Sequence, residues 1–154
     1  MRGLLSKRNN MSDIIDPKLH SVIANAVIFD GNKVLVSQRS LEEAHEPGKW
    51  TIPGGKIDRT EGDIFNIIED TLAREVMEEA GVEIEKEVRM ITNNTFIRSN
   101  GQHVIAMVFK CKYKSGEAKP LEDTIDCKWV TKDEIEKMEF PPNVKNYILK
   151  GFEI

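Results

Sequence analysis

Residues 74–82 read REVMEEAGV, and this stretch places three glutamates, Glu75, Glu78 and Glu79, within five residues of one another. On a helix, residues three and four positions apart share a face with about 5–6 Å between their Cβ atoms, so these carboxylates repel one another. Arg74 can pair with Glu78, but one cation does not neutralise three anions. The cluster is therefore either a solvated acidic face or a site for a divalent cation, because hard cations such as Mg²⁺ bind carboxylate oxygens.

Apolar residues around the cluster predict an amphipathic helix with one face against a core. The stripe recurs every fourth position and comprises Ile64, Ile68, Leu72, Val76 and Ala80. Gly81 is a favoured residue for ending a helix, and Asp63 or Thr60 is the expected N-terminal cap.

Upstream of this helix, the sequence predicts strands joined by turns. Residues 21–38 contain two apolar, β-rich segments around the Asp-Gly-Asn sequence at 30–32, which indicates a hairpin. A long polar loop follows. It ends at the Pro-Gly-Gly sequence at 53–55, where we expect regular structure to break and the backbone to approach another group closely.

Downstream, three further strands are expected over Arg89–Arg98, His103–Tyr113 and Thr124–Val130. A short helix should follow, with a capping box formed by Thr131 and Glu134. A last helix, with prolines near its first turn, is expected at the end of the chain. This order of elements predicts one mixed α/β domain.

Composition and charge limit the class of protein. The chain has 154 residues, 40% of them hydrophobic, and a formal net charge of −4, which argues against a protein that grips long nucleic acid. The N-terminus lacks the apolar run of an export signal, and no stretch approaches the roughly 18 apolar residues of a membrane helix. We therefore expect a cytoplasmic protein with no membrane partner, a loose N-terminal segment over residues 1–20 and a domain over residues 21–154. Cys111 and Cys127 are expected to be buried strand residues.

Two segments together, GGKID at 54–58 and REVMEEAGV at 74–82, resemble the signature of the Nudix hydrolase family. In that pattern a glycine is followed by five residues, a glutamate, seven more residues, and then Arg-Glu-apolar-x-Glu-Glu-x-Gly-apolar. The second half is matched in full here. Other segments, including VIFDGNKVLVSQRS, CKWVTKDEIEKM and FPPN, are similar to MutT-like members of the family. The resemblance implies the Nudix fold, an α/β/α sandwich around a mixed β-sheet.

The first half of the signature departs from the family pattern. Gly55 and Arg74 are nineteen positions apart where the pattern has fourteen, so five extra residues lie between them. Strict spacing back from Arg74 puts Asn66 where the first glutamate belongs, whereas Asp63, which follows a glycine, is the more similar acid. The departure concerns the geometry of the loop and the start of the helix, not the glutamate cluster.

The resemblance implies metal-dependent hydrolysis of a nucleoside diphosphate linkage. Glu75, Glu78 and Glu79, together with the carbonyl of Gly54, carry over as ligands of Mg²⁺ or Mn²⁺. Glu75 and Glu78 are also expected catalytic residues, and Arg74 is expected to orient the cluster by pairing with a carboxylate.

Family members differ in the general base, which is a glutamate of the signature in some and an acid on a later loop in others. Glu117, Glu122 and Asp123 are the loop candidates in this chain, and each is also explained as ordinary surface charge.

For the substrate, Arg39 and Lys56 are candidate phosphate contacts, and Phe140 and Asn143 are candidate contacts of a nucleobase. Each has a structural alternative: Lys56 as a solvated turn residue, for example, and Phe140 as a hydrophobic staple at a helix start.

The resemblance leaves several substrates open. Residues 91–100, ITNNTFIRSN, lack the proline and the tyrosine typical of subfamilies that cleave ADP-ribose and dinucleoside polyphosphates. The preferred hypothesis is hydrolysis of a nucleoside triphosphate to the monophosphate and pyrophosphate. The base of this nucleotide can be an oxidised or non-standard one. Alternatives are a pyrophosphatase for a nucleotide sugar or another diphosphate ester, and a non-catalytic nucleotide-binding module. A monomer or a homodimer is expected.

Overall fold

The structure, a computed structural model, describes residues 16, 18–57 and 61–154. Most of the expected N-terminal segment, and Thr60 as one of the two expected caps, lie outside these residues.

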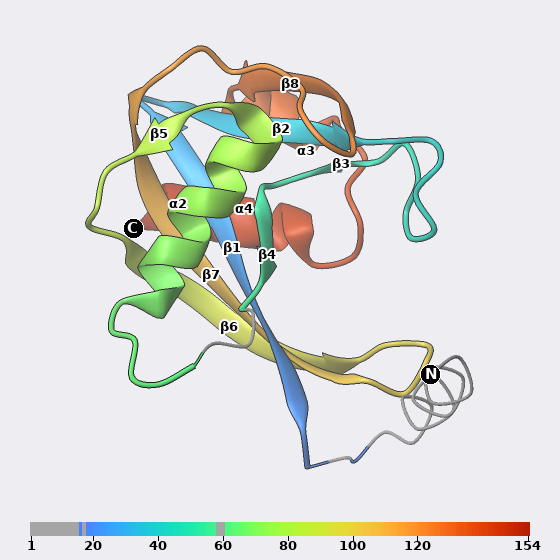
Figure 1. Cartoon of the computed structure of the whole chain (residues 1–154). Coiled ribbons are helices and arrows are strands. Elements are labelled where there is room, and N and C mark those ends of the chain that lie inside the picture. Colours follow the sequence, from blue (N-terminus) through green and yellow to red (C-terminus); the bar gives the residue numbers. More distant parts are fainter. Residues whose placement is uncertain (1–15, 17, 58–60) are drawn as a thin grey trace.

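The described chain forms eight strands and three helices around a central sheet (Figure 1). In chain order they are β1 (His20–Asp30), β2 (Lys33–Arg39), β3 (Trp50–Thr51), β4 (Gly54–Lys56), α2 (Ile67–Ala80), β5 (Glu83–Ile84), β6 (Arg89–Ile97), β7 (His103–Ser115), β8 (Thr124–Val130), α3 (Lys132–Glu136) and α4 (Val144–Glu153). None of these helices is long and apolar enough to cross a membrane.

The sheet is mixed, as predicted. β1 runs parallel to β7, from His20 opposite His103 to Phe29 opposite Lys112. The other pairings are antiparallel: β1 with β2 and β4, β2 with β3 and β8, and β7 with β5 and β6. The predicted hairpin is confirmed, with Gly31 at φ 62° in the turn between β1 and β2.

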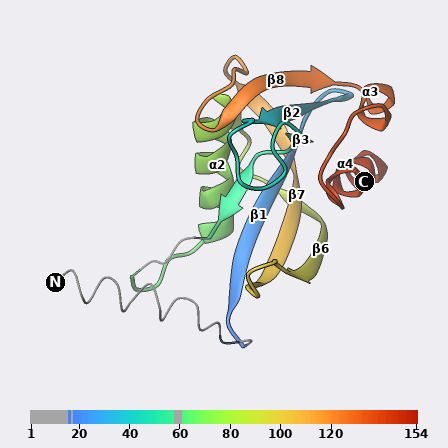
Figure 2. The same ribbon diagram turned by 90° about the vertical axis from the view of Figure 1, so that its right-hand side faces the viewer.

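Alternating side chains of β1 build two cores, one on each face of the sheet. Ala24, Ala26 and Ile28 pack with the apolar stripe of α2, whereas Val27 and Phe29 pack with residues of α3 and α4. Figure 2 shows α2 on one side of the sheet and α3 and α4 on the other. This arrangement confirms the α/β/α sandwich.

The predicted start of the helix that carries the glutamates is wrong. α2 begins at Ile67 with Asn66 as its cap, three residues after the expected first apolar residue, Ile64. Asn66 adopts the left-handed conformation (φ 61°), and Ile64 lies outside the helix and is 46% exposed. The five extra residues are thus absorbed before the helix. The predicted end is confirmed, because Gly81 takes a φ of 72° and its N–H bonds to the carbonyl of Met77.

Three other expectations need correction. The glycine turn is a short strand, β4, paired with β1, although its close approach to another group is confirmed below. α4 begins at Val144, so the prolines at 141 and 142 precede its first turn. Cys111 is buried in β7 as expected, but Cys127 in β8 is only partly buried. The capping box of Thr131 and Glu134 is confirmed at the start of α3.

Candidate active site

The middle and end of α2 pack against β4, the strand that contains Gly54 and Gly55. This packing brings two of the three glutamates to β4. The backbone N–H of Gly54 donates a hydrogen bond to Oε2 of Glu79 at 3.0 Å. A Cβ atom added to Gly55 would lie only 2.5 Å from the carboxyl carbon of Glu75. A side chain at position 55 would therefore displace the Glu75 carboxylate, which explains a glycine here in physical terms.

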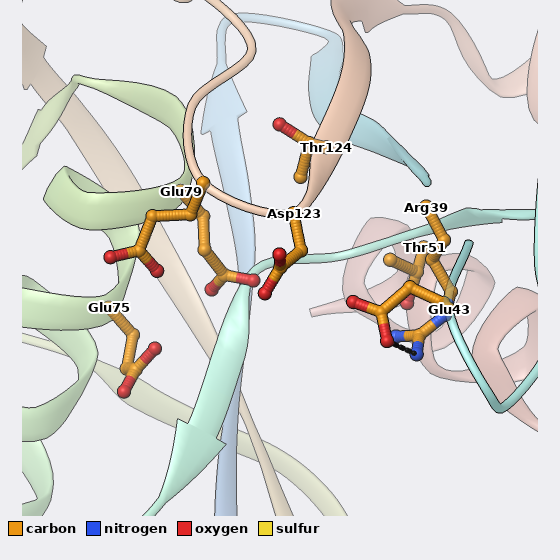
Figure 3. Close-up of a pocket in the computed structure, with 8 residues that line it drawn as sticks. Arg39, Glu43, Thr51, Glu75, Glu79, Asp123 and Thr124 are labelled. Carbon is orange, nitrogen blue, oxygen red and sulfur yellow. Dashed lines mark ion pairs between the residues drawn. The ribbon is translucent and has the colours of Figure 1, made fainter. Parts of the chain in front are cut away.

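A loop between β7 and β8 brings two more acids to the same place. Glu122 and Asp123 line a cavity of about 170 Å³ together with Glu75 and Glu79. Figure 3 shows Glu75 and Glu79 on one side of Asp123, and the ion pair of Arg39 and Glu43 on the other. Of the three loop acids considered from the sequence, Glu117 alone does not line the cavity.

The electrostatics of the cavity are unfavourable for so many anions. Burial raises the pKa of the Glu79 carboxyl to about 8, and the charges of Glu75 and Glu122 add to this rise. The hydrogen bond from Gly54 and the charge of Arg39 oppose it. The positive charge around Glu79 is therefore not sufficient to compensate for the burial of a carboxylate at this position.

Glu78 shares Arg74 with Glu75 but has different surroundings from the other two glutamates of the cluster. Nη1 of Arg74 is 3.3 Å from Oε1 of Glu75 and 3.8 Å from Oε2 of Glu78, so the expected pairing of Arg74 with the cluster is present. Glu78 does not line the cavity. The three carboxylates were expected to converge; Glu75 and Glu79 both line the cavity, whereas Glu75 and Glu78 meet at Arg74.

A larger groove adjoins the acidic cavity, because Arg39 and Thr51 line both. Its volume is about 540 Å³. Its walls come from β1, from β6 and the turn after it, from β7, and from α4 with the segment before it. They include Ile23, Asn25, Phe96, Arg98, Ala106, Pro141, Pro142, Asn143, Val144 and Tyr147. Nε of Arg39 donates to the carbonyl of His45 at 2.9 Å, which holds the guanidinium at the junction.

The structure places the remaining predicted substrate residues in three different surroundings. Asn143 lines the groove. Phe140 is partly buried against the core that contains residues of α3 and α4. Lys56 lines neither the cavity nor the groove. Because successive strand residues face opposite ways, Lys56 points away from Glu75, which Gly55 faces.

Sequence reasoning missed several polar residues of the groove, among them Asn25, Glu46 and Arg98. Asn25 had a signal, because it is an amide inside an otherwise apolar strand, VIANAVIF. Arg98 had none, since an arginine before a turn is ordinary surface composition.

The NUDIX domain family matches residues 19–150 by its sequence model, nearly the whole described chain. The chain belongs to the Nudix family. It is a Nudix pyrophosphohydrolase by this assignment, and the three glutamates of the second half of the signature, Glu75, Glu78 and Glu79, are present.

Individual Nudix proteins support the assignment. A MutT-like protein of Streptomyces ambofaciens is 31% identical over 121 residues, which cover 77% of this chain and 69% of that protein. The crystal structure of a MutT NUDIX hydrolase from Burkholderia pseudomallei is similar with a TM-score of 0.68 and 25% identity, covering 86% of this chain and 98% of that one. The fold is also shared with the NUDIX domain of Shewanella oneidensis NrtR, solved in complex with ADP ribose, with a TM-score of 0.71 and 21% identity over 94% of this chain and 96% of that one.

Nudix enzymes generally use divalent metal ions, and the donor set of the cavity fits them. Carboxylate oxygens are the ligands of Mg²⁺ and Mn²⁺, and no histidine or cysteine that would favour a softer metal lines the cavity. Within the described chain, no three acidic, histidine or cysteine side chains already stand in the arrangement of a formed metal site.

Proposed function

We propose that this protein is a magnesium-dependent pyrophosphohydrolase that converts a nucleoside triphosphate to the monophosphate and pyrophosphate. The proposal rests on one observation. Arg39 and Thr51 line both the acidic cavity and the groove, so the two spaces adjoin each other. A substrate can then place its polyphosphate at the acids and its nucleoside in the groove at the same time. A cavity of acids alone would repel a polyphosphate, so the proposal requires a cation.

Glu75, Glu78 and Glu79, with the carbonyl of Gly54, are the proposed ligands of Mg²⁺ or Mn²⁺. When bound, such a cation screens the phosphate charge and acidifies a coordinated water. Arg74 holds Glu75 and Glu78 in place through its two contacts. Arg39 supplies donors to a phosphate oxygen at the entrance of the cavity.

The proton of the attacking water needs an acceptor within hydrogen-bonding reach. Glu122 and Asp123 are the candidate acceptors among the loop acids, because both line the cavity with Glu75 and Glu79. A glutamate of the signature is the alternative acceptor. Individual replacement of Glu122 and Asp123 by their amides distinguishes these cases.

The groove is suited to the nucleoside half of the substrate. It combines an aromatic ring, Phe96, with the amides of Asn25 and Asn143. The Asn143 side chain makes no capping hydrogen bond to α4. Its amide is therefore available to a base edge, which supports the proposed role of Asn143.

A second substrate class is favoured by one comparison. The NrtR domain that shares this fold was solved with ADP ribose. ADP-ribose and nucleotide sugars carry the same diphosphate bridge, so they belong in any substrate panel. A module that only binds nucleotides is disfavoured because Glu75, Glu78 and Glu79, the glutamates of the second half of the signature, are all present.

The decisive experiment measures phosphate-containing products from a panel of nucleoside triphosphates, nucleotide sugars and ADP-ribose, with Mg²⁺, Mn²⁺ or EDTA. We expect pyrophosphate release from at least one triphosphate, and a loss on the order of 10²-fold or more in Glu78→Gln. Asp70→Asn is the matched control, because Asp70 is exposed on the same helix and does not line the cavity. Nucleotide binding without cleavage of any compound would favour the binding module.

A further inference from the structure

The strand β6 is an edge of the central sheet. Among the described strands it pairs with β7 alone, and β7 has β1 on its other side. Figure 1 shows β6 at the margin of the sheet, in the long ribbon that it forms with β7. An edge strand presents a row of backbone N–H and C=O groups with which another strand can pair.

The hydrogen bonds at the end of this ribbon show which residues of β6 direct their backbone groups outward. The N–H of Arg98 donates to the carbonyl of Gln102 at 2.9 Å, across the turn from β6 to β7. Bonding direction alternates along a strand of an antiparallel pair, so every second residue before Arg98 also bonds to β7. The backbone groups of Asn93, Thr95 and Ile97 therefore point away from β7. Within the described chain these outward groups have no backbone partner.

β6 lacks the residues that normally keep an edge strand from pairing with another chain. Residues 90–97, MITNNTFI, contain no charged residue and no proline. The strand β8, which pairs with β2 alone among the described strands, holds Asp126 and Lys128 within its seven residues. Charged residues and prolines are common protection for an exposed edge. β6 thus has the composition of a strand paired on both sides, such as residues 103–109 of β7, at an edge of the sheet.

Apolar side chains are exposed beside this edge. Ile97 is 62% exposed and Ile105 is 37% exposed. Ile105 lies opposite Thr95 in the ribbon, two residues before Met107, which packs against the core on the α2 side of the sheet. Ile97, Thr95 and Ile105 therefore share the α2 face. A strand added to β6 would cover part of this apolar surface, which favours association.

The sequence of β6 is suited to pairing with its own copy. A two-fold axis through Thr95 sets two copies of β6 antiparallel, because a two-fold interface uses the same surface of both chains. Thr95 then lies opposite the partner's Thr95, and Asn93 opposite the partner's Ile97. All of these residues have outward backbone groups, so each opposed pair can exchange both of its N–H···O bonds. No opposed pair brings like charges together.

We propose that two copies of this protein form a homodimer in which their β6 strands pair antiparallel about Thr95, so that the two sheets become continuous. The pairing ends near Thr92, because the register of β6 against β7 shifts between Met90 and Thr92, and such a bulge bends the strand. The free edge by itself would accept any extended strand. The absence of charge and the match of β6 to its own copy favour a second copy. This inference does not depend on the proposed function, because association is measured without substrate.

Thr95 gives the most direct test, since the axis places it opposite its own copy. Thr95→Lys and Thr95→Asp each bring two like charges together, so each should raise the dimer dissociation constant by about 10-fold or more. An equimolar mixture of the two variants brings opposite charges together across the axis and should restore the affinity. Sedimentation velocity over a range of protein concentrations measures the dissociation constants. Recovery in the mixture also shows that each variant is folded.

Ile97→Lys and Ile125→Lys form a matched pair of variants on the two edges. Ile97→Lys removes an apolar side chain from the proposed interface, and we expect it to raise the dissociation constant by about 10-fold. Ile125 is 48% exposed on β8, the edge strand that holds its own charges. Ile125→Lys should therefore match the wild type.

Hydrogen exchange followed by NMR locates the contact. The amides of Asn93, Thr95 and Ile97 should exchange more slowly as the protein concentration rises, because their N–H groups become bonded in the dimer. The proposal is overturned if the mixture of Thr95→Lys and Thr95→Asp fails to restore the dimer, or if neither these variants nor Ile97→Lys weakens it. A wild type that remains a monomer also overturns it. Slow exchange of the three amides in that monomer would assign the edge to another segment of the same chain, and fast exchange would leave it open to a strand of a different protein.

Discussion

The backbone N–H of Leu121 donates a hydrogen bond to the carbonyl of Glu79 at 3.1 Å, so the loop with Glu122 and Asp123 is attached to the helix with the glutamate cluster. The N–H of Lys119 donates in the same way to the carbonyl of Ala80 at 3.0 Å. The last carbonyls of a helix have no partner within it. The loop supplies these partners, and the two sets of acids thereby take fixed positions relative to each other.

Replacing Leu121 by proline removes the N–H donor to Glu79, whereas replacing it by alanine keeps the donor. We expect Leu121→Pro to lower kcat/KM by about 10-fold or more, because a misplacement near 1 Å can cost up to 10²-fold. Leu121→Ala should lose less than Leu121→Pro. The measurement is steady-state kinetics together with Mn²⁺ affinity by electron paramagnetic resonance. Equal effects of the two variants would show that the side chain, not the backbone bond, positions the loop.

The close approach of Gly55 to Glu75 gives a second prediction. The Cβ of Gly55→Ala would meet the end of a flexible side chain, which can turn away at little cost to folding. The Glu75 carboxylate would then leave its position beside β4. We expect a fall in activity on the order of 10-fold or more, with a change in unfolding free energy of less than about 1 kcal/mol.

Kinetics of Gly55→Ala beside Gly62→Ala, and chemical denaturation of Gly55→Ala beside the wild type, check this prediction. Gly62 is a loop glycine whose added Cβ would meet no atom of the described chain within 4 Å, so Gly62→Ala is the control for activity; its φ of 78° strains an alanine, so its stability is not compared. The explanation from Glu75 would be abandoned if both variants lose activity equally.

Local patterns were sufficient to predict much of the fold. The apolar residues Leu72, Val76 and Ala80 are buried in α2, and Gly81 ends the helix, because period and capping act within a few residues. The short strands β3, β4 and β5 were missed because their pairing with distant strands, rather than their own composition, makes them strands.

For the candidate site too, some features could be predicted from the sequence and others could not. The sequence predicted that the backbone at residues 53–55 approaches another group closely, and the hydrogen bond from Gly54 to Glu79 is such a contact. The sequence could not show that Glu122 and Asp123, rather than Glu117, reach the same cavity. Their position depends on the bonds of the loop to α2 and to Ser40, whose N–H donates to the carbonyl of Asp123.

Substitutions of Asn66 test the departure from the family pattern, because strict spacing assigns the first glutamate of the signature to this position. Its φ of 61° is left-handed and its side chain makes no capping bond. We expect Asn66→Glu to destabilise the protein by about 1 kcal/mol without raising activity, because the left-handed region costs an ordinary residue about 1–2 kcal/mol. Asn66→Gly should remain within about 0.5 kcal/mol of the wild type. Denaturant unfolding measures both, and a gain of activity in Asn66→Glu would contradict this account of the helix start.

The raised pKa of Glu79 predicts how the stability of the metal-free protein depends on pH. The folded carboxyl titrates near 8 and the unfolded one near 4.5, so between these values the folded state holds a proton that the unfolded state releases. Unfolding free energy should therefore fall as pH rises through this window, by at most about 1.4 kcal/mol per pH unit from this group. Glu79→Gln keeps an acceptor for the Gly54 N–H but removes the titration, so it should be more stable than the wild type at pH 8 and differ little at pH 4.5. Denaturation in EDTA from pH 4.5 to 8.5 measures the difference, with Glu117→Gln, an exposed acid outside the cavity, as control. A difference between wild type and Glu79→Gln that does not change with pH would show that Glu79 is not held protonated by its surroundings.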